Sequence, residues 1–530
     1  MGNAYFLRVR GDKADNLERA IVAYTEALKV RTFDTFPQDW ASTQNNLANA
    51  YLFRIKGNKA NNLKQAIKFY QNALKIRTKE DTPLDCLLTA RNLGILYYTE
   101  NQWQPATETY HLAIESLENA RIEALNPQNR QQTLSNAIDV FYGIVQAYIN
   151  LNQPDKALEY IERSKARNLV ELMAQKNLKP QGIEQAMIEQ WDKLRQRVVN
   201  EQIRLQNQSI KQNTSLNDNL IPYVTDQSHL KEYQQELNNF IDQKITPFDP
   251  TFKLTQKVEP ISFKEIQSLS DIETCLLQFY ITGEKILAFV VSYDTQIKVW
   301  ESSTSDLQAL SDTINNYLQL YYSKNGKQEW INQLPNLLQT FADNLHIQDI
   351  FDLIPESCQR LIIIPHRYLH ILPIHTFPFK NGEYFYQSFT KGIAYAPSCQ
   401  LLKLVKESSK QTQLNRLFAI NNPTRKDLKP LLGTNLEIEK IKQGFKLDQT
   451  IIIAEKEASK ITLTQRKQEL QSAHCIHFSC HGKFNQLLDK ALENKRDRLK
   501  FKDLLESSVK RQPYPFENPY YWSGFICTGV

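Results

Sequence analysis

The residues best suited to chemistry lie in one short segment near the C-terminus, AHCIHFSCHGKF (Ala473–Phe484). Its apolar start predicts a buried strand, and Gly482 gives the backbone room to turn directly after His481. Reactive groups gather at the carboxyl ends of strands in parallel sheets, and a histidine titrates near neutrality, as a general base requires. The same place also suits a histidine that only satisfies hydrogen bonds. The residues alone leave both interpretations open.

The elements that must position His481 are predicted by a change of pattern after three helix-breaking prolines, Pro247, Pro250 and Pro260. Short, almost continuously apolar segments follow, and helical patterns lie between them. Such an alternation indicates a mostly parallel sheet covered on both faces. The strand segments are TCLLQFYI and ILAFVV around a Gly283–Glu284 turn, then RLIIIPH, RLFAIN, TIIIAE and CIHFSCHG.

The first third of the chain repeats itself with an offset of 46 residues. GDKADNLERAIVAYTEALKVRT from Gly11 aligns with GNKANNLKQAIKFYQNALKIRT from Gly57. A fixed period of this size predicts stacked helical pairs, because one pair cannot bury its apolar face alone. A third unit over 91–117 has the spacing of a tetratricopeptide repeat, and a looser fourth unit covers 136–172. The first ten residues match the second half of a helix, so we expect the first repeat to be truncated.

Composition narrows the classes of protein. Seven scattered cysteines without a CxxC pair are typical of a reducing compartment, and they predict neither a disulfide framework nor a metal site. A net charge of +6 without a basic cluster does not predict a nucleic-acid partner. No apolar run is long enough to span a membrane, and the start of the chain lacks a secretory pattern. We therefore expect a cytoplasmic protein without a cofactor, a metal or a membrane partner.

With these motifs in view, the chain resembles the bacterial TPR-CHAT proteins, in which tetratricopeptide repeats precede a caspase-like CHAT domain. Besides AHCIHFSCHGKF, several segments carry the resemblance in the family's order. They are ALEYIERSKARNLVELMA (Ala157–Ala174), IIIPHRYLHILPIHTFPFKNGEYF (Ile362–Phe385), IAYAPSCQLL (Ile393–Leu402) and ENPYYWSGFICTG (Glu517–Gly529). The resemblance implies an all-α repeat solenoid over 1–175, a helical connector over 176–250 and an α/β caspase-like domain over 251–530.

For chemistry, the resemblance implies a caspase-type pair in which His481 activates a cysteine on the next strand and Gly482 lends a backbone N–H to the oxyanion. The family's nucleophile segment has no counterpart here. A charged, helix-like stretch near 486–516 leads directly to ENPYYW, so the domain is predicted to be incomplete through an internal deletion.

Two other cysteines are weaker candidates for the nucleophile. Cys480 is adjacent to His481, and neighbouring strand residues point to opposite faces. Cys527 follows His481 at nearly the caspase separation, but its context FICTG resembles the closing strand. Cys399 has no motif support, and His370 and His375 are interpreted as framework. The nucleophile is therefore unassigned.

The resemblance implies a cysteine endopeptidase ancestry, with a protein or peptide substrate recruited by the repeats. Because a lone histidine does not replace a covalent nucleophile, we predict that this copy is catalytically impaired. Two alternatives remain: a non-catalytic adaptor that binds proteins, and a degraded gene fragment.

Overall fold

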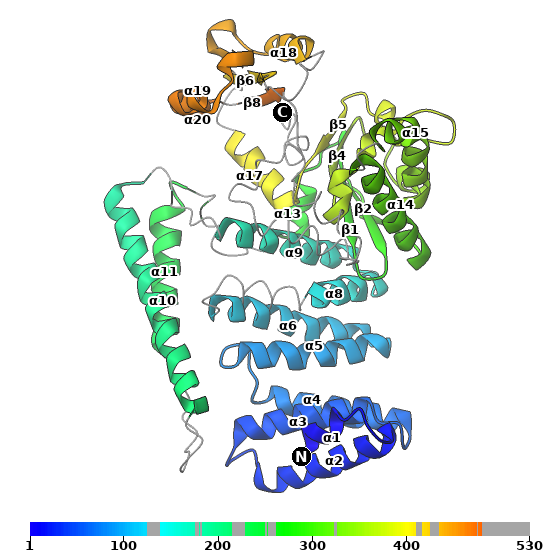
Figure 1. Cartoon of the computed structure of the whole chain (residues 1–530), viewed down its shortest axis with the longest axis vertical. Helices are drawn as coiled ribbons and strands as arrows, with labels where there is room; N and C mark the ends of the chain where they lie inside the picture. The colour runs from blue at the N-terminus through cyan, green and yellow to red at the C-terminus, as the bar shows by residue number, and fades with distance from the viewer. Residues whose placement is uncertain are drawn as a thin grey trace. The chain divides into compact units, whose positions relative to one another are not determined.

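The computed structural model describes residues 1–123, 138–174, 180, 183–214, 228–249, 252, 261–322, 326–409, 416–424, 434–473 and 475–479. Two units share the chain, Met1–Ile261 and Ser262–Val530 (Figure 1). The described part of the first unit is helical, whereas the second unit contains two sheets. No helix in the described ranges is both long and apolar enough to cross a membrane.

In the first unit, successive helices form hairpins, and neighbouring hairpins pack on each other (Figure 1). The helices begin where the sequence supplies a cap: the side chains of Asp12 and Asn58 each accept a hydrogen bond from the N–H three residues later. The helices are α1 (Gly2–Phe6), α2 (Lys13–Val30), α3 (Pro37–Leu52), α4 (Lys59–Leu74), α5 (Pro83–Thr99), α6 (Trp103–Glu123), α8 (Ile138–Asn150), α9 (Pro154–Ala174), α10 (Gln185–Thr214), α11 (Ser228–Phe240) and the π-helix η1 (Ile241–Ile245).

Side-chain contacts in the first unit recur every 46 residues, which is the interval at which the sequence repeats. Tyr24 Oη donates a hydrogen bond of 2.7 Å to Asn3 Oδ1. At the equivalent place, Tyr70 Oη donates one of 2.5 Å to Asn49 Oδ1. Two further contacts recur in the same way: Asn16 to Arg10 O and Asn62 to Lys56 O, and Arg31 to Thr43 and Arg77 to Thr89. The repetition is therefore one of geometry as well as of sequence.

Small residues let the next hairpins approach closely. The ring of Tyr110 on α6 lies against Gly94 on α5 and Gly143 on α8. A Cβ atom would stand 2.7 Å from the ring at Gly94 and 2.5 Å from it at Gly143. Ala106 and Ala113 are also fully buried. The absence of a side chain at Gly94 and the small side chains of the two alanines therefore allow close packing of these helices.

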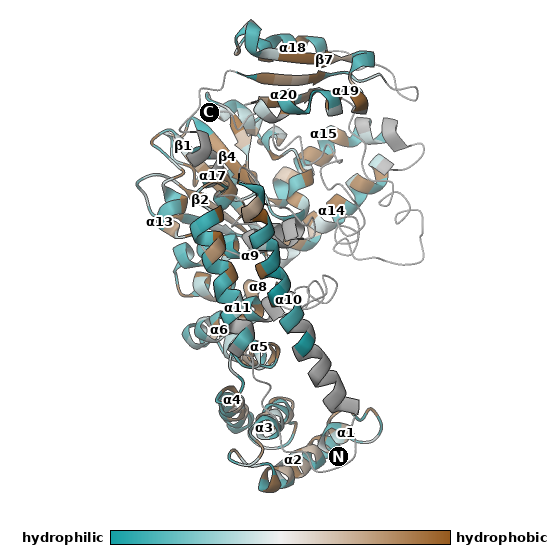
Figure 2. Cartoon of the chain, turned by 90° about the vertical axis from the view of Figure 1, so that its left-hand side faces the viewer, coloured by the Kyte–Doolittle hydropathy of each residue, from teal (hydrophilic) through white to brown (hydrophobic). Residues whose placement is uncertain are grey.

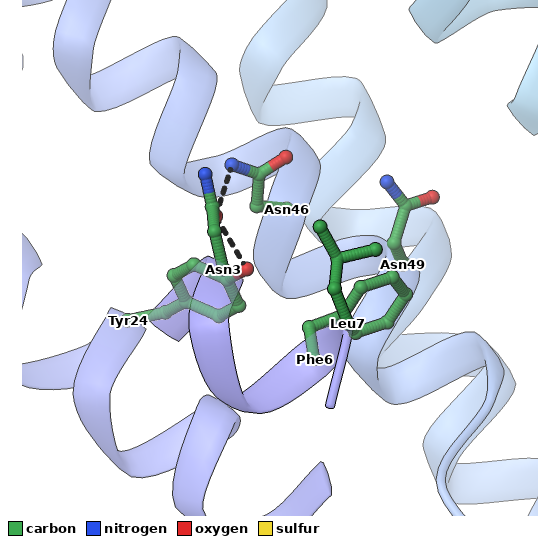
Figure 3. A pocket seen from close by; sticks show the side chains of 6 residues that line it. All are labelled: Asn3, Phe6, Leu7, Tyr24, Asn46 and Asn49. Atoms are coloured by element: carbon green, nitrogen blue, oxygen red, sulfur yellow. Dashed lines mark hydrogen bonds between the residues drawn. The ribbon is translucent and has the colours of Figure 1, made fainter. Parts of the chain in front are cut away.

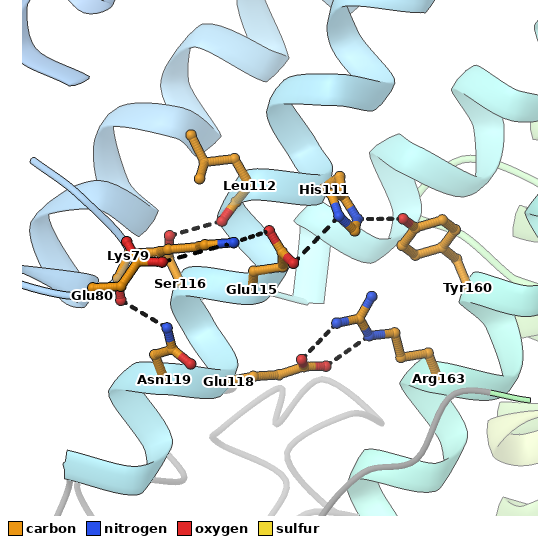
Figure 4. Close-up of polar contacts among 10 residues, drawn as sticks. All are labelled: Lys79, Glu80, His111, Leu112, Glu115, Ser116, Glu118, Asn119, Tyr160 and Arg163. Carbon is orange, nitrogen blue, oxygen red and sulfur yellow. Dashed lines mark hydrogen bonds and ion pairs between the residues drawn. The ribbon is translucent and has the colours of Figure 1, made fainter. Parts of the chain in front are cut away.

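Polar contacts continue the stack from α6 to α9 (Figure 4). The Lys79 ammonium lies 2.9 Å from Glu115 of α6, and His111 Nδ1 lies 2.5 Å from Tyr160 Oη of α9. The Arg163 guanidinium donates two hydrogen bonds, of 2.8 and 2.6 Å, to the Glu118 carboxylate. Such paired geometry fixes direction as well as distance between neighbouring helices.

The larger sheet of the second unit has the order β3-β2-β1-β4-β5. Its first three strands are antiparallel, because the Gly283–Glu284 turn joins β1 to β2 directly, while β4 and β5 run parallel to β1. Register pairs Leu277 with Ile363, and both side chains are buried in a core shared with α14 and α15. The strands are β1 (Thr274–Ile281), β2 (Ile286–Val291), β3 (Lys298–Glu301), β4 (Arg360–Ile364) and β5 (Ile393–Tyr395).

A smaller sheet has the order β7-β6-β8, all parallel. One face packs against Ile438 of α18 and the other against Leu463 of α19 and Leu470 of α20. Strands β4 and β7 are coloured hydrophobic in Figure 2, as their runs of isoleucine require. The strands are β6 (Leu417–Asn421), β7 (Thr450–Ala454) and β8 (Cys475–Ser479).

The expectation of one mostly parallel sheet needs correction. The described residues form two sheets, and the larger one is mixed because its hairpin adds antiparallel strands to one side. The helices of this unit are α13 (Phe263–Gln267), α14 (Thr304–Tyr322), α15 (Gly326–Asn344), α16 (Ile347–Phe351), α17 (Cys399–Ser409), α18 (Thr434–Lys442), α19 (Lys460–Gln465) and α20 (Lys467–Ser472), with short 3-10 turns between them.

Candidate functional site

The four residues named for catalysis from the sequence, His481, Gly482, Cys480 and Cys527, lie outside the described residues. The structure describes the strand that leads to them, β8, up to Ser479. The candidate site is therefore built from the ends of β6, β7 and β8, here called the carboxyl edge. In parallel sheets this edge is where ligands and reacting groups lie.

Pairing with β6 and side-chain packing on both faces fix the direction of β8 at the carboxyl edge. Ser479 lies in register with Asn421 of β6, and the Asn422 N–H donates a hydrogen bond of 2.7 Å to Ser479 O. The side chains of β8 alternate. Phe478 packs in the cluster that contains α19 and α20, while His477 and Ser479 are buried on the side of α18.

Glu437 of α18 contacts both polar side chains of β8. Its carboxylate accepts a hydrogen bond from Ser479 Oγ, and its Oε1 atom lies 3.4 Å from His477 Nε2. The His477 contact becomes an ion pair only if the imidazole is protonated. The His477 side chain is 7% exposed and that of Glu437 45%, so a partly exposed carboxylate lies beside a buried histidine. The end of β8 therefore contacts the helix α18 as well as the strand β6.

Two residues beyond β6 and β7 complete the carboxyl edge. Asn422 and Glu455 have φ values of 44° and 46°, the left-handed region that residues other than glycine seldom adopt. The Thr424 N–H donates a hydrogen bond of 3.1 Å to Glu455 O, which joins the two turns. Backbone strain of this kind persists only where the surroundings fix it, and it clusters at functional sites.

The remaining cysteine and histidines singled out from the sequence lie outside the strands of the larger sheet. Cys399 begins α17, while His370 and His375 lie in the 3-10 turns Arg367–Ile371 and Ile374–Thr376 that follow β4. Cys399 is fully buried, and its thiol donates a hydrogen bond of 3.2 Å to Gln278 Oε1. His375 Nδ1 lies 2.9 Å from Tyr395 Oη, and burial lowers the pKa of His375. The Cys399 and His375 side chains therefore make polar contacts with residues of strands β1 and β5.

The first unit has a pocket of about 210 Å³ between α1, α2 and α3 (Figure 3). Asn3, Phe6, Leu7, Tyr24, Asn46 and Asn49 line it. It is smaller than the roughly 300–1,000 Å³ of most small-molecule sites. Tyr24 and Asn3 also bond to each other there, as their equivalents do in the next repeat. We therefore interpret the pocket as a gap in the packing of these three helices. In the described ranges no three histidine, cysteine or acidic side chains gather as metal ligands.

Comparison with known proteins supports the assignment of the second unit. Residues 334–506 match the family model described as the CHAT domain. The match starts within α15, includes β4 to β8 and continues over His481 and Gly482. No curated protein matches the chain. The second unit therefore carries a CHAT domain, a class related to caspase-like peptidases.

Sequence reasoning did not find Glu437, His477 or Ser479. A signal for the last two was present, because a histidine and a serine two positions apart in an apolar strand lie on one face and need a polar partner. Their partner could not be identified, since Glu437 is 42 residues from Ser479 in the chain.

Proposed function

We propose that this chain is a TPR-CHAT protein, ancestrally a caspase-like cysteine endopeptidase to which the repeats bring a protein or peptide. We further propose that this copy is catalytically impaired. The observation that carries the proposal is the CHAT match over 334–506, within which a parallel strand leads directly into His481 and Gly482.

The recurrent contacts of the first unit support a repeat solenoid. Tyr24 with Asn3 and Tyr70 with Asn49 occupy the same places in successive hairpins. Stacked hairpins that repeat their contacts form extended surfaces, and such surfaces bind proteins and peptides. This argument assigns substrate recruitment to the first unit and cleavage, in the ancestral protein, to the second.

Impairment is supported by the sequence after Gly482. Between Lys483 and Phe516 no apolar segment contains a cysteine, so the expected nucleophile strand has no counterpart. Without a thiolate the covalent route is closed, and the remaining histidine cannot form an acyl intermediate. The second candidate function, a non-catalytic adaptor, follows from the same observation together with the intact helical hairpins.

The cytoplasm is the proposed compartment. The described cysteines, Cys86, Cys275, Cys358, Cys399 and Cys475, are all free thiols. Free, mostly buried thiols are typical of proteins from reducing compartments.

The test begins with the intact mass of the protein from its native source. A mass near 61.7 kDa establishes that the sequence between Gly482 and Glu517 is as printed. A heavier species that carries an additional cysteine segment would overturn the deletion. The purified protein is then treated with a thiol-reactive peptidyl probe, and labelled cysteines are mapped.

Three variants and one control variant make the labelling decisive. We expect that no probe adduct of the unaltered chain is lost in the His481→Ala variant. A His481-dependent adduct that Cys527→Ala or Cys480→Ala removes would show that one of these cysteines has been recruited, and would contradict impairment. His229→Ala, which changes an exposed histidine of α11 in the first unit, is the matched control and should leave labelling unchanged.

A further inference from the structure

Two histidines hold the segment that follows β4 in the larger sheet. This segment, His366–Thr376, is here called the post-β4 segment, and it begins where the parallel strands β1, β4 and β5 end. His366 contacts Ile281, the last residue of β1, and His375 contacts Tyr395, the last residue of β5. An imidazole therefore fastens each end of the post-β4 segment to a different strand.

The first of these contacts fixes the protonation state of His366. The Ile281 N–H donates a hydrogen bond of 2.9 Å to His366 Nδ1. A backbone N–H can only donate, so Nδ1 carries a lone pair and the imidazole is neutral, with its proton on Nε2. Ile281 lies beyond Gln278, the last residue of β1 that pairs with β4. The imidazole therefore serves as the acceptor that the backbone of β4 no longer provides.

The surroundings of His366 hold it in this position. The His366 residue is 8% exposed, and its ring stacks on that of Tyr280 with centroids 4.4 Å apart. Arg367, the next residue, has a φ of 54°, which lies in the left-handed region that residues other than glycine seldom adopt. Backbone strain of this kind persists only where neighbouring contacts impose it. The contact between Ile281 and His366 is one such contact.

The second contact joins His375 to Tyr395 through two atoms. The His375 N–H donates a hydrogen bond of 3.0 Å to Tyr395 Oη, and His375 Nδ1 lies 2.9 Å from the same oxygen. Burial lowers the pKa of His375 and raises the pKa of Tyr395, so both side chains are uncharged near neutrality. The Tyr395 hydroxyl then accepts from the backbone and donates to Nδ1. A proton on Nδ1 would deprive the hydroxyl hydrogen of this acceptor.

We propose that His366 and His375 form an acid-sensitive clamp, which holds the post-β4 segment on β1 and β5 while both imidazoles are neutral and releases it when they are protonated. A proton on His366 Nδ1 would place two donors against each other, the imidazole N–H and the Ile281 N–H. The rings that face the two imidazoles are those of Tyr280 and Tyr395. Phenols are neutral between pH 5 and 7, so neither ring offers a negative charge that would hold the added proton.

The sign of the pH dependence follows from the neutral imidazoles of the clamp. A histidine in an opened segment takes up its proton near pH 6.5, whereas the pKa of His375 in the closed segment is lowered from that value. Below pH 6.5 the opened segment therefore binds more protons than the closed one. The stabilisation by the clamp is complete above pH 6.5 and is lost as pH falls below it.

The first test uses the full, unaltered chain. Amide hydrogen exchange is followed by mass spectrometry at pH 7 and pH 5, and each rate is corrected for the pH dependence of exchange in an unfolded peptide. We expect the protection of peptides that contain Ile281 or the post-β4 segment to fall by about tenfold or more at pH 5. Peptides of α5, in the first unit, should keep their protection. Unchanged protection of the post-β4 segment, or an equal fall in α5, overturns the proposal.

Asparagine variants identify the responsible groups. His366→Asn and His375→Asn each replace the imidazole by a side chain whose amide oxygen can accept a hydrogen bond and does not titrate. Each variant should remove part of the difference between pH 7 and pH 5, and the double variant should remove it entirely. His346→Asn changes a partly exposed histidine outside the post-β4 segment, and this matched control should retain the full difference. A double variant whose protection still falls tenfold would assign the response to other groups and contradict the clamp.

Discussion

Glu437 is the side chain that ties α18 to the end of β8. Its carboxylate accepts from Ser479 Oγ and lies 3.4 Å from His477 Nε2. Glu437→Ala leaves the buried Ser479 hydroxyl without this acceptor and removes the carboxylate beside His477, so we expect a loss of about 1–3 kcal/mol in the free energy of unfolding. Urea denaturation of the full chain measures this loss.

Glu439 provides the matched control on the same helix. It lies 3.4 Å from Lys442 in an exposed i,i+3 pair, and pairs of this kind contribute little. We expect Glu439→Ala to cost less than about 0.5 kcal/mol. Equal losses in the two variants would show that Glu437 has no special role at the carboxyl edge.

At the residue scale, the sequence reveals groups that are neighbours in the chain better than groups that fold together. His481 and Gly482 stand next to each other after an apolar strand, so their pattern could be recognised. Glu437 sits on the exposed side of a helix pattern, where an acidic residue needs no explanation. Only the parallel pairing of β6 with β8 brings α18 and β8 together.

At the element scale, an ion pair joins the short helix α13 to α17. The Glu265 carboxylate lies 2.6 Å from Lys403 and also closes a capping box with Ser262. Hydrogen bonds from Lys403 and then from Ser262 lower the pKa of Glu265 to about 2. Because the folded pKa is depressed, this stabilisation is complete above pH 4.5 and is lost as pH falls from 4.5 through 2.

Glu265→Gln tests this linkage, because glutamine retains the capping box and loses the charge. We expect the unaltered chain to be more stable than the variant at pH 6, and the difference to shrink between pH 4.5 and 2. Lys403→Met removes the other charge of the pair. In that background, the stability difference caused by Glu265→Gln should change less with pH. A gap between the curves that does not change with pH would contradict the assigned role.

The elements themselves were largely predictable, and their assembly was not. Apolar runs such as RLIIIPH and TIIIAE indicate buried strands through local pattern alone, and they form β4 and β7. Which strand pairs with which is decided by contacts between segments distant in the chain. Such contacts also decide that the strands divide into one mixed sheet and one parallel sheet.

At the scale of the molecule, the sequence placed a break where the prolines gather, and the contacts divide the chain at Ile261. Each unit has its own core. In the first, Leu47 packs with Ala20 and Tyr24, whereas in the second Phe341 packs among the strands of the larger sheet. These two clusters of described residues each draw their residues from a single unit.

Separate cores predict separate unfolding transitions. Leu47 and Phe341 are 2% and 0% exposed, so alanine at either position leaves a cavity. We expect Leu47→Ala to cost about 2–5 kcal/mol in the first unit's transition, and Phe341→Ala about 3–5 kcal/mol in the second unit's. Circular dichroism follows the helical unit, and tryptic fragments collected along the urea curve assign each transition. A single transition that both variants shift equally would show that the two cores unfold as one.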